Sequence, residues 1–248
     1  MRENKSPSYC LQTVVAMKKI VVLTGAGMSA ESGLATFRGG GGLWDSYPVE
    51  QVATPEGYSA NPALVLEFYN RRRVELLGVV PNKGHELLAA MEKDYDVTIV
   101  TQNVDDLHER AGSSKVIHLH GELMKGCSSR DPQNPEYVRC LSAENPFISI
   151  GDLADDGSQM RPFIVWFGEA VPMMDEAIQS LNGVDAFVII GTSLNVYPAA
   201  GLLDYVPYGV PVYLIDPNEV RASRDVTVIR KGASEGVQCL FDKFLSAE

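Results

Sequence analysis

Three polar side chains follow an apolar run, close to the point where a strand would end. The run is Val97–Val100, and the side chains are the amides of Gln102 and Asn103 and the carboxylate of Asp105. Two amides and a carboxylate grouped in this way can hydrogen-bond a carboxamide and the hydroxyls of a sugar. The spacing therefore favours a site for such a ligand at the end of this strand.

A histidine follows a second apolar run. His120 comes directly after Val116–Leu119 and precedes Gly121. Histidine is the side chain whose unperturbed pKa suits a general base near neutral pH. Considered alone, a histidine at such a place is more often structural, and both roles stay open at this point.

A glycine-rich turn follows the first apolar run and predicts a bound dinucleotide. The segment Ile20–Ala30 reads IVVLTGAGMSA. Gly25 allows a tight turn, Gly27 lets the backbone approach a pyrophosphate, and Ala30 stands where the third small residue of the fingerprint belongs. The amides of the following helix would face the phosphates. A turn of the same kind without a nucleotide is the alternative.

Short apolar runs alternate with helical patterns along the chain. The runs expected as strands are Ile20–Leu23, Val97–Val100, Val116–Leu119, Phe163–Phe167, Phe187–Ile190 and Val212–Ile215. The helical patterns are Lys83–Lys93, Asp105–Ala111, Asp175–Leu181 and Gly236–Leu245. This alternation predicts an α/β fold with a Rossmann-like parallel sheet flanked by helices. Ligands of such sheets bind at the carboxyl ends of the strands, where the polar residues above are expected.

Two stretches break the alternation and are predicted to pack together as a smaller lobe formed by two insertions. We expect one domain over residues 17–248, preceded by an N-terminal extension at 1–16. The large lobe is expected at about 17–35, 78–124 and 162–248, and the small lobe at about 36–77 and 125–161. The cleft between the lobes would hold the site.

The length of 248 residues and the net charge of −11 limit the classes of function. An acidic chain does not suit nonspecific binding to nucleic acid, although its field would attract a basic peptide. No apolar run approaches the ~20 residues that a membrane span needs. The start of the chain lacks the apolar segment of a signal peptide, so we expect a cytoplasmic protein. A monomer is the expected state.

Several motifs, taken together and in order, resemble the sirtuins, the NAD-dependent protein lysine deacylases. They are GAGMSAESGLATFR at 25–38, TQNVDDLH at 101–108, HLHG at 118–121, FGE at 167–169 and GTSLNVYP at 191–198. The resemblance covers nearly the whole chain from Ile20 to the predicted C-terminal helix. It implies that the chain removes acyl groups from lysine, consumes NAD, and releases nicotinamide and O-acyl-ADP-ribose.

The resemblance also implies roles for single residues on the cofactor side. His120 matches the general base that takes a proton from a ribose hydroxyl. The positions matched to cofactor binding are Gly25, Ala26, Gly27, Thr36, Phe37, Arg38, Gln102, Asn103, Asp105, Thr192, Ser193, Asp216 and Ala233. Phe37 would shield the reacting face from water. Asp216 stands where the family commonly has asparagine, and an acidic residue there suits NAD rather than NADP.

A second set of positions matches the binding of an acylated peptide. They are Val165, Phe167, Gly168, Glu169, Asn195, Val196 and Tyr197. By the resemblance, an extended peptide would add as a strand between the two segments through main-chain hydrogen bonds. Val165 and Phe167 would line the tunnel for the lysine stem.

Tyr69 and Arg72 bear on the identity of the acyl group. Both lie in the predicted helix Asn61–Leu77, three residues apart and therefore on one face. They match a Tyr-x-x-Arg pair of the desuccinylase and demalonylase branch, and arginine suits an acyl group that ends in a carboxylate. The small Ala53 would leave room for a longer acyl chain. The alternative is a solvated basic face at 71–73 with Tyr69 as part of the core.

The sequence departs from the zinc module of two C-x-x-C pairs that most sirtuins carry. Its cysteines are Cys10, Cys127, Cys140 and Cys239. Cys127 lacks a second cysteine at C-x-x-C spacing and Cys140 stands alone, and two thiolates do not complete a tetrahedral site without other ligands such as aspartates. We therefore do not expect zinc. Packing would then hold the small lobe, through Tyr137, Phe147 and Ile148.

Other functions remain open at this stage. Within the enzymes, the rivals are a plain deacetylase, a lipoamidase-like enzyme and an ADP-ribosyl-transferring relative. A module that binds NAD or ADP-ribose without turnover belongs to another class, and His120 argues against it because pure binding needs no base there. A dehydrogenase would fit the glycine turn alone.

Overall fold

The structure is a computed structural model that describes residues 17–36 and 47–245. Three predictions lie outside the described residues: the N-terminal extension 1–16, and the cofactor contacts of Phe37 and Arg38. Among the described residues, the helices are too short or too polar to cross a bilayer.

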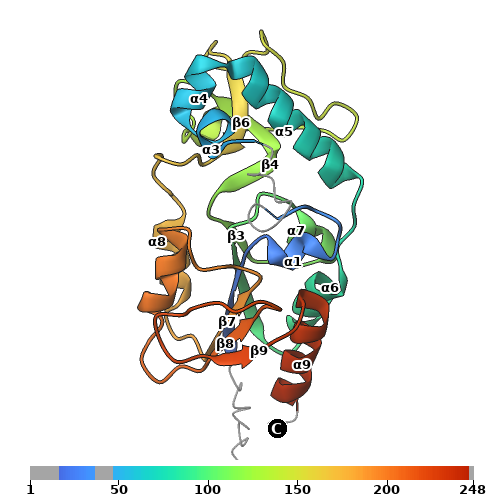
Figure 1. The fold of residues 1–248 in the computed structure, drawn as a ribbon, viewed down its shortest axis with the longest axis vertical. Helices are drawn as coiled ribbons and strands as arrows, with labels where there is room; N and C mark the ends of the chain where they lie inside the picture. Colours follow the sequence, from blue (N-terminus) through green and yellow to red (C-terminus); the bar gives the residue numbers. More distant parts are fainter. Residues whose placement is uncertain (1–16, 37–46, 246–248) are drawn as a thin grey trace, which may run out of the picture.

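Six parallel strands form the larger sheet, in the order β3-β2-β1-β7-β8-β9 (Figure 1). Their bounds are β1 Lys19–Thr24, β2 Asp96–Thr101, β3 Val116–His118, β7 Ala186–Ile190, β8 Val212–Ile215 and β9 Thr227–Ile229. Counted within this sheet, the order is the 3-2-1-4-5-6 of a Rossmann fold, so the predicted fold class is confirmed. The direction of winding changes between β1 and β7, and a ligand crevice is expected beside their carboxyl ends.

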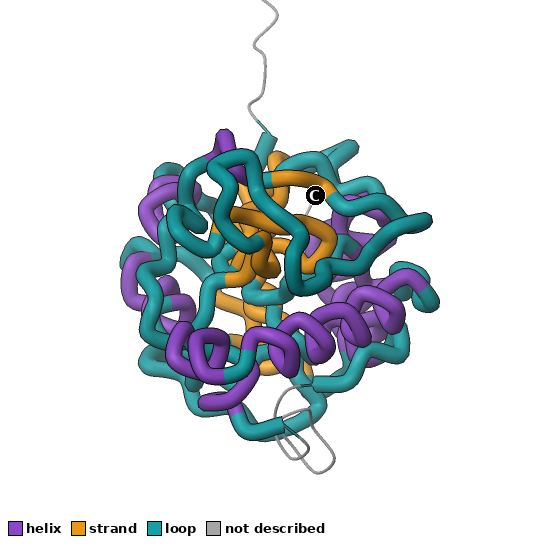
Figure 2. The backbone as a smooth tube through the Cα atoms, turned by 90° about the horizontal axis from the view of Figure 1, so that it is seen from above, coloured by secondary structure: helices purple, strands orange, loops and turns teal. Residues whose placement is uncertain are grey.

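Alternate side chains of β1 enter different cores. Val21 and Leu23 pack into one core, and Ile20 and Val22 pack into a second core on the other face. The first core is covered by α8 (Met174–Ser180) and η2 (Ala199–Tyr205), and the second by α6 (Lys83–Met91) and α9 (Ala233–Leu245). Figure 2 shows the strands at the centre with the helices around them. An unbroken apolar run therefore marks a strand that is buried on both faces.

Within residues 47–164, a smaller antiparallel sheet and three α-helices form the second lobe, at the top of Figure 1. The strands are β4 Gly121–Ser128, β5 Arg139–Cys140 and β6 Met160–Ile164, in the order β5-β4-β6. The helices are α3 Val49–Val52, α4 Pro55–Ala60 and α5 Pro62–Leu77. Shorter helices elsewhere are α1 Gly27–Ala30, α7 Leu107–Ala111 and η1 Pro135–Tyr137. In sequence, β4 starts before and β6 ends after the range 125–161 that the composition assigns to this lobe.

The prediction of a parallel strand at Phe163–Phe167 is wrong. The strand in this region ends at Ile164 and pairs antiparallel with β4 in the small sheet. The apolar run continues past the strand because Ile164 and Trp166 pack into the core of the small lobe, beside Phe68. A short apolar run shows burial, and it does not show which sheet receives the chain.

Helix α5 is defined by its first residues. The side chain of Asn61 caps the helix by accepting a hydrogen bond from the backbone amide of Leu64. Pro62 occupies the first helical position, where the missing N–H of proline costs nothing because that group has no partner within the helix. Further along, Asn70 bonds both backbone groups of Ile148, at 2.9 and 3.0 Å, and Ile148 is fully buried. Ile148 thus helps to hold the small lobe as expected, whereas the same expectation is wrong for Phe147, which is 48% exposed.

Candidate active site

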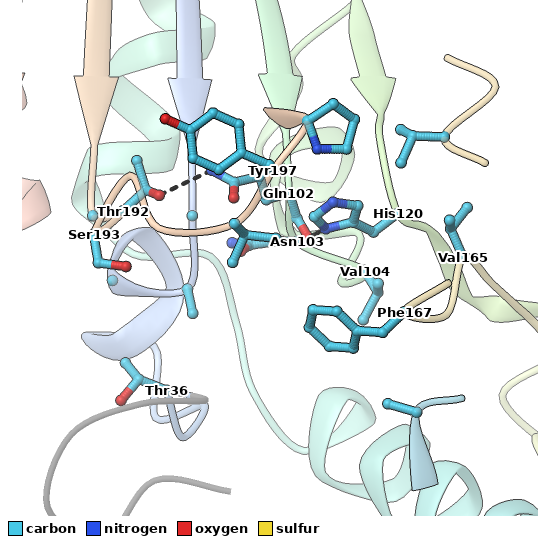
Figure 3. A pocket seen from close by; sticks show the side chains of 18 of the residues that line it. Thr36, Gln102, Asn103, Val104, His120, Val165, Phe167, Thr192, Ser193 and Tyr197 are labelled. Atoms are coloured by element: carbon cyan, nitrogen blue, oxygen red, sulfur yellow. Dashed lines mark hydrogen bonds between the residues drawn. The ribbon is translucent and has the colours of Figure 1, made fainter. Parts of the chain in front are cut away.

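A cleft of about 390 Å³ lies at the carboxyl ends of the parallel strands, and both lobes contribute to its walls. Its size is that of a small-molecule or cofactor site. Most of the site residues predicted from the sequence line it: Gly25, Ala26, Gly27, Thr36, Tyr69, Gln102, Asn103, His120, Val165, Phe167, Gly168, Glu169, Thr192, Ser193, Val196, Tyr197 and Asp216. Figure 3 shows His120, Gln102 and Asn103 between Thr192 and Phe167. Segments far apart in sequence thus meet in one cavity.

The glycine turn is shaped by contact with the turn that follows β7. The Gly27 amide donates to the carbonyl of Gly191 (2.9 Å), and a Cβ on Gly27 would lie 2.7 Å from the Gly191 Cα. Glycine is therefore required here by a backbone-to-backbone contact. The Gly27 amide, expected to face a phosphate, is already bonded within the protein, and α1 is a single turn. Ala30 is exposed, and Met28 and Ser29 are the buried residues of α1.

His120 is held in one tautomer. Its Nδ1 lies 3.0 Å from the carbonyl oxygen of Gln102. A carbonyl oxygen can only accept, so Nδ1 carries the proton and Nε2 keeps its lone pair. Burial lowers the pKa of His120 below its usual range, only partly offset by the bond to Gln102. The ring is therefore neutral at pH 7 and can accept a proton at Nε2 within the cleft.

Gln102 joins the ends of three neighbouring strands. Its side-chain Nε2 donates to Thr192 Oγ1 (3.0 Å), and its backbone N–H donates to the backbone carbonyl of Thr24 (2.9 Å). Its own carbonyl accepts from His120, as described above. The base is thus fixed to the same backbone that ends β1 and β2.

Asn103 and Asp105 lie beside a second, smaller cavity of about 20 Å³, which adjoins the cleft through Ala26, Asn103 and Val104. Asn103 Nδ2 donates to Ser29 Oγ (3.1 Å), and Ser29 Oγ donates to Asp105 Oδ2 (2.9 Å). Burial raises the pKa of Asp105. Asp105 does not line the larger cleft, so its predicted cofactor contact would have to be made from the smaller cavity.

At the other end of the cleft, Thr192, Ser193 and Asp216 follow β7 and β8. The Asp216 carboxylate accepts from the amide of Asn218 (2.8 Å), a neighbour that also lines the cleft. Ala233, expected to contact the cofactor, is the first residue of α9, is buried in the second core and is not part of the cleft wall.

The segment 165–169 forms the wall of the cleft on the side of the small lobe. The Val165 amide donates to the carbonyl of His120 (3.0 Å), and the Phe167 amide donates to the carbonyl of Ala53 (2.9 Å). The Glu169 carboxylate, expected to face the peptide, is paired with Arg161 at 2.7 Å. It therefore shapes the wall. On the opposite segment, Val196 and Tyr197 line the cleft, whereas Asn195 does not.

Tyr69 and Arg72 face different cavities. Tyr69 lines the cleft, and its hydroxyl accepts from Trp166 Nε1 (3.1 Å). Arg72 is buried, lines the smaller cavity, and pairs with Glu75. The reading of 71–73 as a solvated face is wrong for Arg72 and Arg73, which are both buried, and holds for Arg71 alone.

Sequence reasoning missed several residues of the cleft. They are Val104, Ile164, Trp166, Val171, Gly191, Pro198, Asn218, Glu219 and Val220. Trp166 stands within the apolar run Phe163–Phe167, which predicts a buried strand, and this interpretation gave no reason to expect Trp166 in a binding site. The rarity of tryptophan beside the FGE motif was the available clue.

Within the described residues, no group of three or more His, Cys, Asp or Glu side chains is arranged to hold a metal ion. Cys127 is buried, and burial raises its pKa to about 12, which disfavours the thiolate that a metal needs. Cys140 is exposed on β5. The expectation of no zinc stays a prediction.

The strand order, the glycine contact at the change of winding direction and the neutral histidine define a nucleotide-binding α/β protein with a base in its cleft. A sequence profile described as "SIR2: Sir2 family" matches residues 25–198. The chain belongs to the Sir2 family.

Curated relatives and solved structures cover nearly the whole chain. An "NAD-dependent protein deacylase" of Bacteroides thetaiotaomicron is 66% identical over 224 residues, which are 90% of this chain and 96% of the relative. A protein of the same name from Helicobacter pylori strain J99 is 48% identical over 231 residues, 92% of this chain and 96% of the relative. A Sir2 homolog–NAD complex is 36% identical, with a TM-score of 0.80 over 93% of this chain and 91% of that one. A Sir2–p53 peptide–NAD+ complex is 30% identical, with a TM-score of 0.73 over 92% and 94%.

Proposed function

We propose that this Sir2-family NAD-dependent protein deacylase removes succinyl, malonyl and acetyl groups from lysine, and releases nicotinamide and O-acyl-ADP-ribose. The observation that carries the proposal is the position of His120. Its unprotonated Nε2 lies in a cleft lined by Thr192 and Asp216, which follow β7 and β8, and by Tyr69 from α5 of the small lobe. A base between a nucleotide-like end and an acyl-sized end suits transfer from one ligand to the other.

The residues present fit NAD. A Cβ on Gly25 or Gly27 would lie within 3 Å of the backbone at Gly191, so the glycines let the turns after β1 and β7 pack closely at the change of winding direction, where dinucleotides bind in such sheets. Thr192 and Ser193 offer hydroxyls to phosphates, and Asp216 can accept from ribose hydroxyls. Bound NAD would supply the ribose carbon that receives the acyl oxygen, with nicotinamide as the leaving group.

The chain's own residues hold the reactants and move one proton. His120 Nε2 accepts a proton from a ribose hydroxyl, and the Gln102 carbonyl holds Nδ1 so that the resulting imidazolium is stabilised. Apolar side chains from Val104 and Ile164 exclude water from this part of the cleft. The exposed side chains of Phe167 and Tyr197 flank the entrance, where an extended acyl-peptide would lie between the two segments.

The acyl preference rests on Tyr69 and Arg72. Tyr69 lines the cleft, and Arg72 lines the adjoining cavity, which shares Ala26, Asn103 and Val104 with the cleft. A carboxylate at the end of the acyl chain would attract the guanidinium away from Glu75, whose side chain is half-exposed and loses little on release. The two donors would then meet one carboxylate.

One peptide carrying acetyl-, succinyl- or malonyl-lysine tests the proposal. Wild-type protein, Arg72→Met and Arg71→Met are compared, with nicotinamide and the acyl product followed by chromatography and mass spectrometry. Arg71 is the matched control because it lies one position away, is exposed, and pairs with Glu67. We expect Arg72→Met to lower kcat/KM for the succinyl peptide about 10–100-fold, the value of a hydrogen-bonded charge pair, and to spare the acetyl peptide.

Two results would overturn the proposal. If Arg72→Met removes succinyl groups as fast as the wild type does, Arg72 does not set a preference for succinyl or malonyl groups. Binding of NAD without release of nicotinamide, or transfer of ADP-ribose to protein, would remove the deacylase chemistry itself.

A further inference from the structure

Trp166 is the donor that holds the hydroxyl of Tyr69. The indole Nε1 lies 3.1 Å from Tyr69 Oη, and the two side chains are only 2% and 5% exposed. They come from different parts of the small lobe, Tyr69 from α5 and Trp166 from the wall segment after β6. Both also line the cleft. The contact therefore joins helix α5 to the segment 165–169 that forms the cleft wall.

The indole ring is itself held from behind. The Arg161 guanidinium carbon lies 3.5 Å from the centroid of the Trp166 ring, a cation–π contact. Arg161 makes two bonds to the carboxylate of Glu169, at 2.7 and 3.0 Å, and Glu169 Oε2 accepts the Trp166 amide at 2.8 Å. Backbone and ring of Trp166 are thus both fixed, and the direction of its N–H is fixed with them.

The chemistry of the contact assigns the hydrogens. An indole N–H can only donate, so the phenolic oxygen of Tyr69 accepts here. The hydroxyl keeps its own hydrogen for another acceptor. Burial raises the pKa of Tyr69, so the phenol stays protonated at all working pH values. A protonated hydroxyl in the wall of a cleft suits an acceptor such as a carboxylate.

We propose that Trp166 is a positioning residue that determines acyl specificity: its N–H occupies one lone pair of the Tyr69 oxygen and so turns the Tyr69 O–H toward the terminal carboxylate of a dicarboxylic acyl group. The inference rests on the proposed function and adds a residue to it. Without the indole donor, the hydroxyl can rotate, and part of the population would present a lone pair to the carboxylate. Acetyl-lysine has no terminal carboxylate and is indifferent to this direction.

The test is a double-variant cycle read on three acyl groups. Wild type, Trp166→Phe, Tyr69→Phe and the double variant are assayed on one peptide carrying succinyl-, butyryl- or acetyl-lysine. Butyryl has the length of succinyl without its charge. We expect Trp166→Phe to raise KM for the succinyl peptide and lower kcat/KM about tenfold, as for one hydrogen bond to a charged group. The acetyl and butyryl peptides should change less than about twofold, because phenylalanine keeps the aromatic ring over Arg161. In the Tyr69→Phe background, Trp166→Phe should have no further effect on the ratio of succinyl to acetyl activity.

Tyr58→Phe is the matched control. The Tyr58 ring packs on Trp166 with centroids 5.1 Å apart, but its hydroxyl takes no part in the link to Tyr69. We expect this variant to leave the acyl ratio unchanged. Should Trp166→Phe fold poorly, β-(3-benzothienyl)alanine placed at position 166 replaces the N–H with sulfur in the same ring shape, and should give the same tenfold loss.

Two outcomes would overturn the inference. One is an equal loss on all three acyl groups, and the other is a loss on succinyl that persists in the Tyr69→Phe background. These outcomes differ from failure of the proposed function, in which wild-type protein does not remove succinyl at all or Tyr69→Phe leaves its removal intact.

Discussion

Gly27→Ala tests whether the turn after β1 is as tightly packed as the structure describes. The new Cβ would lie 2.7 Å from the Cα and 2.9 Å from the carbonyl oxygen of Gly191, whereas ordinary contacts start at 3.4 Å. Gly191 is packed just as closely from its own side, since a Cβ on Gly191 would lie 2.4 Å from the amide nitrogen of Met28, and no free space separates the two turns. The turn after β1 must therefore move away from the turn after β7.

The magnitude follows from three terms. Overpacking against backbone costs about 1–3 kcal/mol, and loss of the Gly27–Gly191 hydrogen bond costs about 1 kcal/mol. The reduced freedom of alanine in the unfolded chain returns about 0.4–1 kcal/mol. The net loss is about 1–3.5 kcal/mol, and its middle value of about 2 kcal/mol corresponds to a fall in Tm of roughly 4–8 °C for a chain of this size. Because the moved turn lines the cleft, the KM for NAD should rise as well.

Thermal unfolding and NAD titration of the same preparations measure both effects. Gly78→Ala is the control, since Gly78 has an ordinary φ of −84° and a Cβ there would lie 3.4 Å from its nearest neighbour. This control should melt within about 2 °C of wild type. If Gly27→Ala does the same and binds NAD normally, the contact between the two turns is not what requires glycine.

Two further predictions concern the base and the metal. Burial lowers the pKa of His120, and Nε2 must be unprotonated to act, so the acid side of the pH profile of kcat/KM should have its midpoint below the ordinary histidine value of about 6.5. The profile is measured at peptide concentrations well below KM, and a midpoint at or above about 6.5 would contradict this reading. Elemental analysis of purified protein should find far less than one zinc per chain, and chelator should leave both Tm and activity unchanged; a stoichiometric metal would show that the two cysteines recruit other ligands.

The parallel sheet was readable from the sequence because its strands are buried on both faces. Every side chain in runs such as Ile20–Leu23 and Phe187–Ile190 is apolar, so both faces of the strand can be buried, and each run forms a strand in the predicted place. By contrast, β9 is short and mostly exposed, and no apolar run marked it. The run at Phe163–Phe167 was misassigned because it belongs to the core of the other lobe.

The candidate site was readable where one motif holds its own residues together, as at Gln102 and His120. It was less readable on α5. Residues three apart in a helix share a side but differ by about 60° around the axis. That angle is enough to direct Tyr69 into the cleft and Arg72 into the neighbouring cavity. Which lone pair of the Tyr69 hydroxyl is occupied depends on Trp166, nearly a hundred positions away, and no local pattern encodes it.

The core of the small lobe contains Leu107, which is the first residue of α7, the helix that follows β2. A side chain from the nucleotide half is thus an internal part of the other half, packed with Val65 and Ile164. If the whole small lobe were exchanged for that of a relative, Leu107 would remain with the large lobe and would have to pack into a core that did not evolve with it. New substrate ranges are accordingly more accessible through one or two point changes along the cleft than through recombination of whole modules.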